Sequence, residues 1–479
     1  MRPELKEFHY DWQLAVTFKN LAALLGNTTS GERDAVFSIL PRRTTTYNLL
    51  NQIGDAMLYL VEATQQWLED LVYAKERGKK AVLTTYCYPV GILQAFDCVP
   101  VNAEVLTAYG GLVFNRGLGD FLDYCVEIGM TETSCSGQRG SMGAYLAGLG
   151  TEPDFCLANT AGICDSNANS FHFFTSYKDI PMYMHDAPPQ LSGERATRYH
   201  RRDFRTMLTF LEAQTGKKVD WDRLREVVLE IKRQDDLIND IQQLMTMVPS
   251  PVPSLATPII YLLKFGFNGV ASATRVLEEL LRVCLENYQK GLAGTSSGRE
   301  KARCLTSYID HYTMDFRFFG FFNDLDISMM GSMLNYFFPE GAPYAAGRED
   351  QCYRMDLSSE ESVIDSLADQ LARMPMIKQI RGPYDAPEMW LEDTLSACKI
   401  YRPDCTIYLG TLGCRNTWGM VKPFIRDLEA AGYPSYALFA DAFDDRVKSW
   451  EACKDGILEF FEVRQILEND KNRRAKIPG

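Results

Sequence analysis

The sequence predicts an α/β protein with two parallel-sheet domains, a helical N-terminal arm and a helical insertion. Three observations carry this prediction: a strand–helix–strand pattern that occurs twice, helical periodicity before the first copy, and long charged amphipathic helices between the copies. Strands that alternate with helices are typical of parallel sheets, because the crossover between two parallel strands is usually a helix. The length of 479 residues exceeds what one hydrophobic core supports, so more than one domain is expected.

The charge balance argues against two classes of partner. Lys and Arg together number 50 against 63 for Asp and Glu, and the net charge of -13 opposes binding to nucleic acid or anionic lipid. The N-terminus has no apolar stretch of signal-peptide length, and no uncharged apolar run reaches the length of a membrane helix. We therefore expect a cytoplasmic protein whose partners include neither nucleic acid nor membrane.

Residues 1–75 are predicted to form the helical arm. Apolar residues recur there at helical spacing, namely Leu49, Leu50, Ile53, Met57, Leu60, Val61 and Ala63. The polar stretch AKERGKK separates the arm from a first α/β domain, predicted over residues 76–190. In that domain AVLTTYCYPVGILQAF and CVPVN are expected to be strands, and strand and helix signals then alternate from DFCLANTAGICD to IPMYMHDAP.

Residues 191–300 are predicted to form the helical insertion, and residues 301–479 the second α/β domain. The insertion contains DWDRLREVVLEIKRQDDLINDIQQLM with Asp220 as its N-cap, and the stretch VPSPVPS ends that helix because proline disfavours helix. In the second domain DFRFFGFFND can form a packed aromatic core or the wall of an apolar ligand site, and the core is the preferred interpretation. The phenylalanines concerned are Phe316, Phe318, Phe319, Phe321 and Phe322.

A weak internal repeat places one cysteine at an equivalent point of each domain. DFCLANTAGICD up to IPMYMHD is similar to CTIYLGTLGCR up to YPSYALFAD, so Cys164 corresponds to Cys414 and Asp186 to Asp441. Ligands of open parallel sheets bind outside the carboxyl ends of the strands, as in flavodoxin-like and Rossmann-like folds. Two such domains that face each other would bring both cysteines to a shared site.

Three of the thirteen cysteines have a context that suits a cofactor. Cys135, Cys164 and Cys414 each lie in a Gly- or Ser-rich loop where a helix is expected to begin, and the N–H groups of a helix start favour a thiolate. No two cysteines are separated by only two residues, so compact zinc and ferredoxin motifs are absent. Thiolates from three loops suit an iron–sulfur cluster, although the residues alone favour the alternative that all thirteen are packing residues.

At these positions the sequence resembles the 2-hydroxyacyl-CoA dehydratase and benzoyl-CoA reductase family, particularly the larger subunit of the dehydratases. The similarity runs from about residue 75 to 190 and again from about 400 to 465, and four motifs carry it in order. The matching residues are Pro89, Ala95, Phe96 and Glu104 in the first motif, Cys135 and Arg139 in the second, Cys164, Ile180, Pro181 and Asp186 in the third, and Cys414, Gly432, Pro434, Asp441, Asp444 and Arg446 in the fourth.

The resemblance implies a [4Fe–4S] cluster held by Cys135, Cys164 and Cys414, with the fourth iron position open. It implies a hydro-lyase that converts an (R)-2-hydroxyacyl-CoA to a 2-enoyl-CoA through a ketyl radical, in oxygen-sensitive anaerobic metabolism. The implied partners are the acyl-CoA substrate, a homologous second subunit in a heterodimer, and a separate ATP-dependent iron–sulfur activator that injects one electron.

Further residues are candidates for substrate contacts. Glu104 is the candidate polar group near the open iron, and Thr85 and Tyr86 are the candidate partners of the substrate hydroxyl, each with a structural role as its alternative. Arg139 is expected to orient the Cys135 loop or to pair with Asp186. An arginine-rich segment offers a basic patch for the coenzyme A phosphates, although a solvated helix face is the preferred interpretation; it contains Arg195, Arg198, Arg201, Arg202 and Arg205.

Alternative functions stay open at this level. A benzoyl-CoA reductase-type subunit would share the cluster and reduce an aromatic ring, a non-catalytic electron-relay or partner subunit would lack its own substrate pocket, and a metal-free relative would be purely structural. Gly91 stands where the family has a glutamate, which is compatible with the relay subunit. His172 and His185 lie near the Cys164 loop in sequence and can donate protons, although a structural role is preferred.

Overall fold

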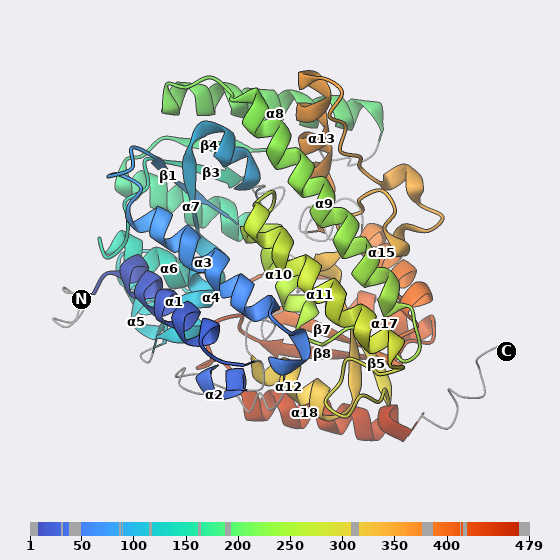
Figure 1. Ribbon diagram of the computed structural model, residues 1–479. Coiled ribbons are helices and arrows are strands. Elements are labelled where there is room, and N and C mark those ends of the chain that lie inside the picture. Colours follow the sequence, from blue (N-terminus) through green and yellow to red (C-terminus); the bar gives the residue numbers. More distant parts are fainter. Residues whose placement is uncertain are drawn as a thin grey trace.

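A computed structural model shows two parallel sheets joined by a layer of helices (Figure 1). The structure describes residues 8–29, 32–37, 49–85, 88, 90–114, 117–160, 164–186, 193–307, 316–375, 387–411, 413–414 and 419–468. The predicted contributions of Tyr86 and Pro89 lie outside these residues. Within the described part of the chain, the helices are too short or too polar to cross a membrane.

Sheet A forms the first α/β unit. Its four parallel strands are β1 (Lys80–Thr84), β2 (Cys98–Asn102), β3 (Phe155–Asn159) and β4 (Met182–His185), in the spatial order β2-β1-β3-β4. Its helices are α4 (Ala103–Val113), α5 (Gly119–Glu127), α6 (Ser136–Leu146) and α7 (Asp165–Lys178). Strand β3 is buried along its whole length, as expected for a central strand covered on both faces.

Sheet B repeats this topology. Its strands are β5 (Ala302–Ser307), β6 (Ile327–Ser332), β7 (Cys405–Thr411) and β8 (Ser435–Ala440), in the spatial order β6-β5-β7-β8. Counted along the chain, both sheets therefore have the strand order 2-1-3-4. The helices of this part are α12 (Phe316–Asp324), α13 (Glu360–Ala372), α15 (Pro387–Tyr401), α17 (Val421–Ala430) and α18 (Trp450–Val463). The predicted fold class of two parallel-sheet domains is confirmed.

One element of the first unit differs from the prediction. Val90–Phe96, expected to be part of a strand, forms the 3₁₀ helix η4. All of its residues except Gln94 are buried, whereas a half-buried strand would need strict alternation of buried and exposed residues. Shorter 3₁₀ turns are η3 (Asn51–Ile53), η6 (Met333–Asn335), η7 (Pro343–Ala345), η8 (Glu349–Gln351) and η9 (Ile466–Glu468).

The N-terminal arm is helical, as predicted. It consists of α1 (Tyr10–Gly26), α2 (Arg33–Phe37) and α3 (Ala56–Val72), and α1 and α3 lie side by side in Figure 1. A buried carboxylate fastens α1 to the first α/β unit, because Asp11 accepts hydrogen bonds from Tyr145 of α6 and from the backbone N–H of Thr151 at 2.7 Å. Satisfying a buried carboxylate in this way offsets its desolvation.

Four long helices lie between the sheets in the chain, as the sequence predicts. They are α8 (Glu194–Thr215), α9 (Trp221–Met245), α10 (Ala256–Gly266) and α11 (Ala271–Gln289). Asp220 caps α9 by accepting a hydrogen bond from the Arg223 N–H at 3.0 Å, which confirms its predicted N-cap role. Helix α9 ends at Met245, directly before the proline-rich stretch that was expected to stop it.

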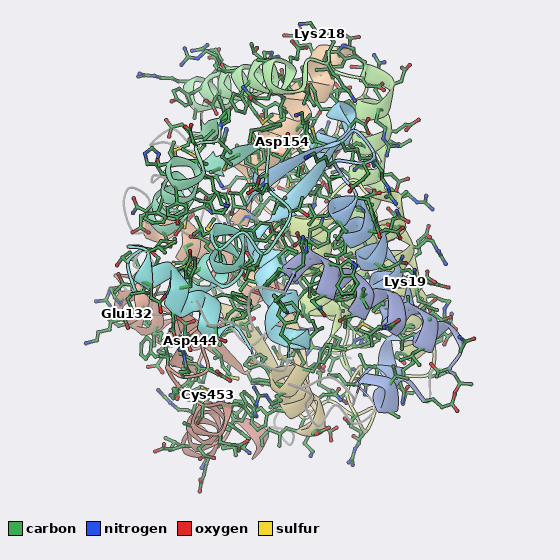
Figure 2. All side chains as sticks on the ribbon, turned by 90° about the vertical axis from the view of Figure 1, so that its left-hand side faces the viewer. Lys19, Glu132, Asp154, Lys218, Asp444 and Cys453 are labelled. Carbon is green, nitrogen blue, oxygen red and sulfur yellow. The ribbon has the colours of Figure 1, made fainter. Side chains whose placement is uncertain are left out.

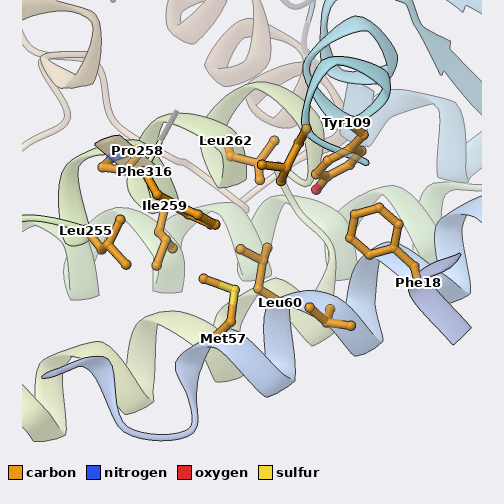
Figure 3. Close-up of a pocket in the computed structure, with 11 residues that line it drawn as sticks. Phe18, Met57, Leu60, Tyr109, Leu255, Pro258, Ile259, Leu262 and Phe316 are labelled. Atoms are coloured by element: carbon orange, nitrogen blue, oxygen red, sulfur yellow. The ribbon is translucent and has the colours of Figure 1, made fainter. Parts of the chain in front are cut away.

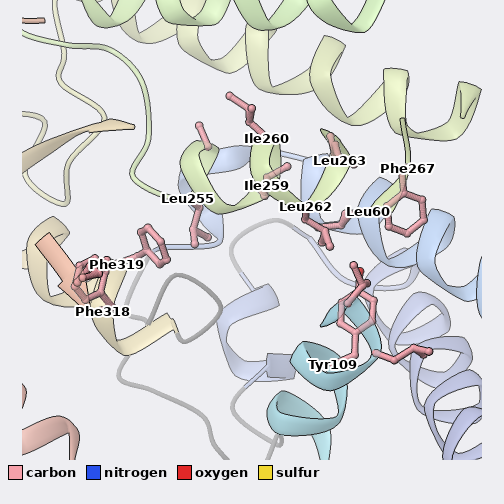
Figure 4. Close-up of a cluster of buried hydrophobic side chains, with 14 of the residues drawn as sticks. Leu60, Tyr109, Leu255, Ile259, Ile260, Leu262, Leu263, Phe267, Phe318 and Phe319 are labelled. Atoms are coloured by element: carbon pink, nitrogen blue, oxygen red, sulfur yellow. The ribbon is translucent and has the colours of Figure 1, made fainter. Parts of the chain in front are cut away.

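Helix α10 is buried on nearly all sides and joins the two α/β units. Its Phe265 carbonyl accepts a hydrogen bond from Asn102 at the end of β2, at 3.3 Å, and α10 also contacts β6 of sheet B. The apolar side chains of α10 pack between those of the arm, α4 and α12 (Figure 4). An apolar cavity of about 60 Å³ remains at this junction, lined by residues that include Phe18, Met57 and Phe316 (Figure 3).

The phenylalanine-rich helix α12 belongs to this core. Phe318, Phe319 and Phe322 are fully buried and make edge-on or tilted ring contacts with their neighbours. Phe316 and Phe321 are partly buried and pack against the same cluster. The core interpretation is confirmed for this segment, with Phe316 alone reaching the small cavity.

Candidate functional site

The candidate site lies where the carboxyl ends of both sheets face each other. Thr85 follows β1, Cys164 lies beyond β3, and Cys414 lies beyond β7. Cys135 and Glu104 come from helix starts of the first unit, at α6 and α4. This is the place at which open parallel sheets bind ligands.

The loop of Cys135 is fixed from two sides. Cys135 occupies the N-cap position of α6, and its backbone N–H donates to Ser166 Oγ of α7 at 2.9 Å. Ser166 Oγ in turn donates to Gln138 Oε1 at 3.2 Å. On the other side, Arg139 Nε donates to the Ser134 carbonyl at 3.0 Å. These contacts set the direction of the Cys135 side chain from both neighbouring helices.

Arg139 thus orients the Cys135 loop, which was one of its two predicted roles. The predicted ion pair with Asp186 is wrong, because Asp186 accepts hydrogen bonds from Thr160 Oγ1 at 2.7 Å and Tyr199 OH at 2.6 Å instead. A guanidinium that binds backbone carbonyls fixes a loop without adding an ion pair to the site.

Cys164 occupies the N-cap position of α7 and is 8% exposed. Its Sγ accepts a hydrogen bond from the backbone N–H of Asn167 at 3.3 Å. The first turn of α7 therefore contacts both cysteines, since Ser166 binds the Cys135 backbone and Asn167 binds the Cys164 sulfur. Hydrogen bonds of this kind stabilise a thiolate or a metal-bound thiolate.

Cys414 reaches the same place from sheet B. Its neighbour Gly413 lies directly against the Cys135 backbone, and a Cβ at position 413 would lie 2.8 Å from Cys135 Cα. Cys414 is 5% exposed, and its N–H donates to the Thr411 carbonyl at 3.1 Å. The helix described after it begins at Val421, so the predicted place of Cys414 at a helix start is not seen in the described residues.

The protonation of Cys135 differs from the prediction. Burial raises the pKa of the Cys135 thiol, and the neighbouring Cys414 and Asp441 raise this pKa further. The helix start does oppose the shift through the Gly137 N–H, but it is the smaller effect. In the protein alone the thiol is therefore favoured over the thiolate, and a cationic metal centre would reverse that preference.

The loop after β8 contacts the start of α6, beside Cys135. Asp441 Oδ1 accepts hydrogen bonds from the N–H groups of Phe443 at 3.1 Å and Asp444 at 3.0 Å, and the Phe443 N–H also contacts Ser136 Oγ at 3.2 Å. Arg446 joins Asp444 at 2.7 Å to Asp123 of α5 at 3.0 Å. These residues hold the loop, as expected, and Figure 2 shows Asp444 at the junction of the two units.

Thr85 and Glu104 meet beside the cysteines. Thr85 Oγ1 donates to Glu104 Oε1 at 2.9 Å, and Asn167 Nδ2 reaches the same Glu104 oxygen at 3.4 Å. Thr85 is fully buried and Glu104 is 5% exposed. The charge of Glu104 contributes to the raised pKa of the Cys135 thiol and of the Cys156 thiol on β3, so this carboxylate is an electrostatic neighbour of the site.

Other predicted contributors lie elsewhere or have other partners. His185 is buried and its Nδ1 contacts Asp203, which supports its structural role, while His172 is exposed on the outer face of α7. Two of the five arginines of α8 form ion pairs with α13: Arg201 pairs with Asp369 at 2.8 Å and Arg205 with Asp365 at 2.6 Å. Because these two cations are paired with carboxylates of α13, they are less available to bind the phosphates of coenzyme A.

The residues of the site include the soft donors that an iron–sulfur cluster takes. Within the described ranges, no three His, Cys, Asp or Glu side chains converge on one point that could hold a metal ion. A cluster does not require such convergence, because each of its irons takes its own thiolate. Cys135, Cys164 and Cys414 supply soft donors from three loops that contact one another through Ser166 and Gly413.

Sequence reasoning missed four residues that shape the site: Gly413, Ser166, Gln138 and Asn167. Ser166 and Asn167 are short polar residues in the first turn of a helix, where capping is their ordinary role. Their distinguishing signal is their position directly after Cys164. Gly413 directly precedes a candidate cysteine, which could have indicated a close backbone approach.

Comparison with known families assigns the chain. The family model for the 2-hydroxyglutaryl-CoA dehydratase D-component matches residues 85–463, which is well over half of the chain and spans all five predicted site residues from Thr85 to Cys414. A search of curated proteins finds no match. The chain therefore belongs to the 2-hydroxyglutaryl-CoA dehydratase D-component family.

Proposed function

We propose that this chain is the subunit of a radical 2-hydroxyacyl-CoA dehydratase that holds a [4Fe–4S] cluster through Cys135, Cys164 and Cys414. The observation that supports it most is the junction of Cys135 with the other two cysteine loops, through Ser166 on one side and Gly413 on the other. Family membership supports the dehydratase chemistry in general. The substrate class is an (R)-2-hydroxyacyl-CoA and the product a 2-enoyl-CoA.

The reaction is an elimination without net oxidation. The C–O bond at carbon 2 and a C–H bond at carbon 3 break, a C=C bond forms, and water leaves. When bound, the cluster would supply a one-electron relay to the thioester and an iron that polarises the departing hydroxyl. Because the electron is not consumed, one injection can serve many turnovers.

The residues of the chain would bind the hydroxyl and manage its proton. Glu104 is held at Oε1 by Thr85 at 2.9 Å, in a setting from which water is largely excluded. A carboxyl group so placed can hold or give the proton that turns the departing hydroxyl into water. Thr85 orients that carboxyl group through its hydrogen bond to Oε1.

The proposal includes two protein partners and a compartment. An electron energetic enough to reduce a thioester has to come from a separate donor, so we include an ATP-dependent iron–sulfur activator and a homologous second subunit. The twelve cysteines in the described part of the chain are thiols rather than disulfides, which suits the reducing cytoplasm and an oxygen-sensitive cluster.

One observation favours a second candidate, a subunit that relays electrons without its own substrate. Gly91 of η4 lies against the backbone, and a Cβ there would lie 2.5 Å from the Asn268 carbonyl oxygen. A glutamate at this position is therefore sterically excluded, and the substrate contact expected of it is absent. A relay subunit would keep the cluster but would tolerate the loss of the Glu104 carboxylate.

Anaerobic turnover with the second subunit, the activator, ATP and a reductant tests the proposal. (R)-2-hydroxyglutaryl-CoA and a series of other (R)-2-hydroxyacyl-CoA esters are the probes, and 2-enoyl-CoA is measured. We expect Glu104→Gln to lower kcat by about 10²–10⁴-fold. Glu132→Gln is the matched control, because Glu132 is exposed in the same domain. Full activity of Glu104→Gln would favour the relay subunit.

A further inference from the structure

The first turn of α7 carries a residue that connects the thiol of Cys164 with the carboxylate of Glu104. Asn167 is 1% exposed, and its backbone N–H donates to Cys164 Sγ at 3.3 Å. Its side-chain Nδ2 donates to Thr85 Oγ1 at 2.5 Å and to Glu104 Oε1 at 3.4 Å. One asparagine therefore contacts a candidate cluster ligand and both candidate substrate-binding residues.

The contact of Asn167 with Glu104 restricts the orientation of the Glu104 carboxylate. Thr85 Oγ1 and Asn167 Nδ2 both reach the same oxygen, Oε1, from two different elements of the first unit. Donors on one oxygen restrict the rotation of the carboxylate and favour its charged form. Asn167 thereby helps to fix the plane of the Glu104 carboxylate, and with it the direction in which its oxygens face a ligand.

The carbonyl oxygen of the Asn167 side chain is a second observation that indicates a ligand at this site. Its Oδ1 is buried and has no hydrogen-bond partner among the residues that the structure describes. A buried acceptor without a donor is costly, and native structures contain few of them. A hydroxyl that enters the site beside Glu104 would supply the missing donor.

We propose that Asn167 is a positioning residue of this site, which orients the Glu104 carboxylate through Nδ2 and offers Oδ1 as an acceptor to the substrate hydroxyl. The inference rests on the proposed function and extends it to a residue outside the predicted set. Loss of the amide would disturb Glu104 and the hydroxyl contact while the three cysteines stay in place.

A measurement without substrate tests the contact with Glu104. In the purified heterodimer, the infrared carbonyl band of protonated Glu104 is identified by its loss in Glu104→Gln and followed against pH. We expect Asn167→Leu to raise the pKa of Glu104 by about one pH unit, because one donor to the carboxylate is lost. Asn167→Ser is a smaller second variant, and Asn169→Leu, at an exposed position of the same helix, is the control. An unchanged midpoint in both Asn167 variants would overturn the proposal.

A double-mutant cycle tests whether Asn167 acts through Glu104. We expect Asn167→Leu to lower kcat about tenfold or more, with iron and sulfide content as in wild type, and to add little in the Glu104→Gln background. Additive losses, or a loss of iron in both Asn167 variants, would contradict the positioning role. If the wild type dehydrates none of the esters, the proposed function fails, and the infrared result still decides the role of Asn167.

Discussion

Gly413 lies against the backbone of Cys135, so the loop that follows β7 in sheet B touches the start of α6 in the first unit. A Cβ at position 413 would lie 2.8 Å from Cys135 Cα and 3.0 Å from its nitrogen. Such distances to backbone atoms are too short for any residue other than glycine. The approach of Cys414 to Cys135 therefore depends on the absence of a single methyl group.

Gly413→Ala is expected to separate the Cys414 loop from Cys135. The added methyl group clashes with backbone atoms, which cannot rotate away as a flexible side chain can. We expect the variant to fold but to hold less iron than wild type after anaerobic purification. Gly419→Ala is the matched control, because a Cβ at 419 would meet no atom of the described residues within 4 Å. Wild-type iron in Gly413→Ala would contradict the close contact.

Lys264→Met is expected to destabilise the fold by about 3–5 kcal/mol, because it leaves the buried Asp235 carboxylate without its cation. Lys264 and Asp235 are 4% exposed and in contact, and Tyr353 OH donates to the second Asp235 oxygen at 2.8 Å. Urea unfolding measures the change. Lys232→Met breaks an exposed pair on α9 and should cost about 0.5 kcal/mol or less. Equal losses in the two variants would refute the buried-pair argument.

Asp203 is expected to make the protein acid-sensitive. Burial raises its pKa, but hydrogen bonds from His185 and Tyr183 outweigh burial, so the pKa of Asp203 lies below its ordinary value. A lowered folded-state pKa stabilises the fold above the unfolded pKa of about 3.9, and this contribution disappears as pH falls through the folded pKa. Thermal unfolding between pH 5 and pH 3 should therefore show that Asp203→Asn loses less stability on acidification than wild type does.

The control for this experiment is Asp222→Asn, since the Asp222 side chain is 98% exposed. This variant should lose as much stability on acidification as wild type does. The argument fails if Asp203→Asn loses as much stability on acidification as wild type does.

Sequence reasoning reached the fold class of this protein, two parallel-sheet domains, because the repeat encodes it. Cys164 and Cys414 occupy the same place in two units with the same strand order, and Asp186 and Asp441 follow equivalent strands. Short apolar strands that alternate with helices leave a strong pattern in the sequence. The prediction that the cysteine loops meet followed from the rule that parallel sheets bind ligands at the carboxyl ends of their strands.

The contacts that build the site could not be predicted in the same way. The contact of Ser166 with Cys135 and that of Gly413 with Cys135 join residues far apart in the chain, and the local sequence does not reveal the partner in either contact. Burial also determines the pKa of Cys135, and burial is set by the packing of the whole molecule. The ion pairs of Arg201 with α13 were equally invisible, because an amphipathic helix does not reveal what covers it.

Iron and acid-labile sulfide per chain test the central claim most directly. After strictly anaerobic purification we expect about four of each in wild type and their loss in Cys414→Ala. Cys284→Ala, a fully buried cysteine on α11, is the control and should keep both. A folded wild-type protein without iron and sulfide, or a Cys414→Ala variant that retains them in full, would contradict a cluster held by Cys135, Cys164 and Cys414.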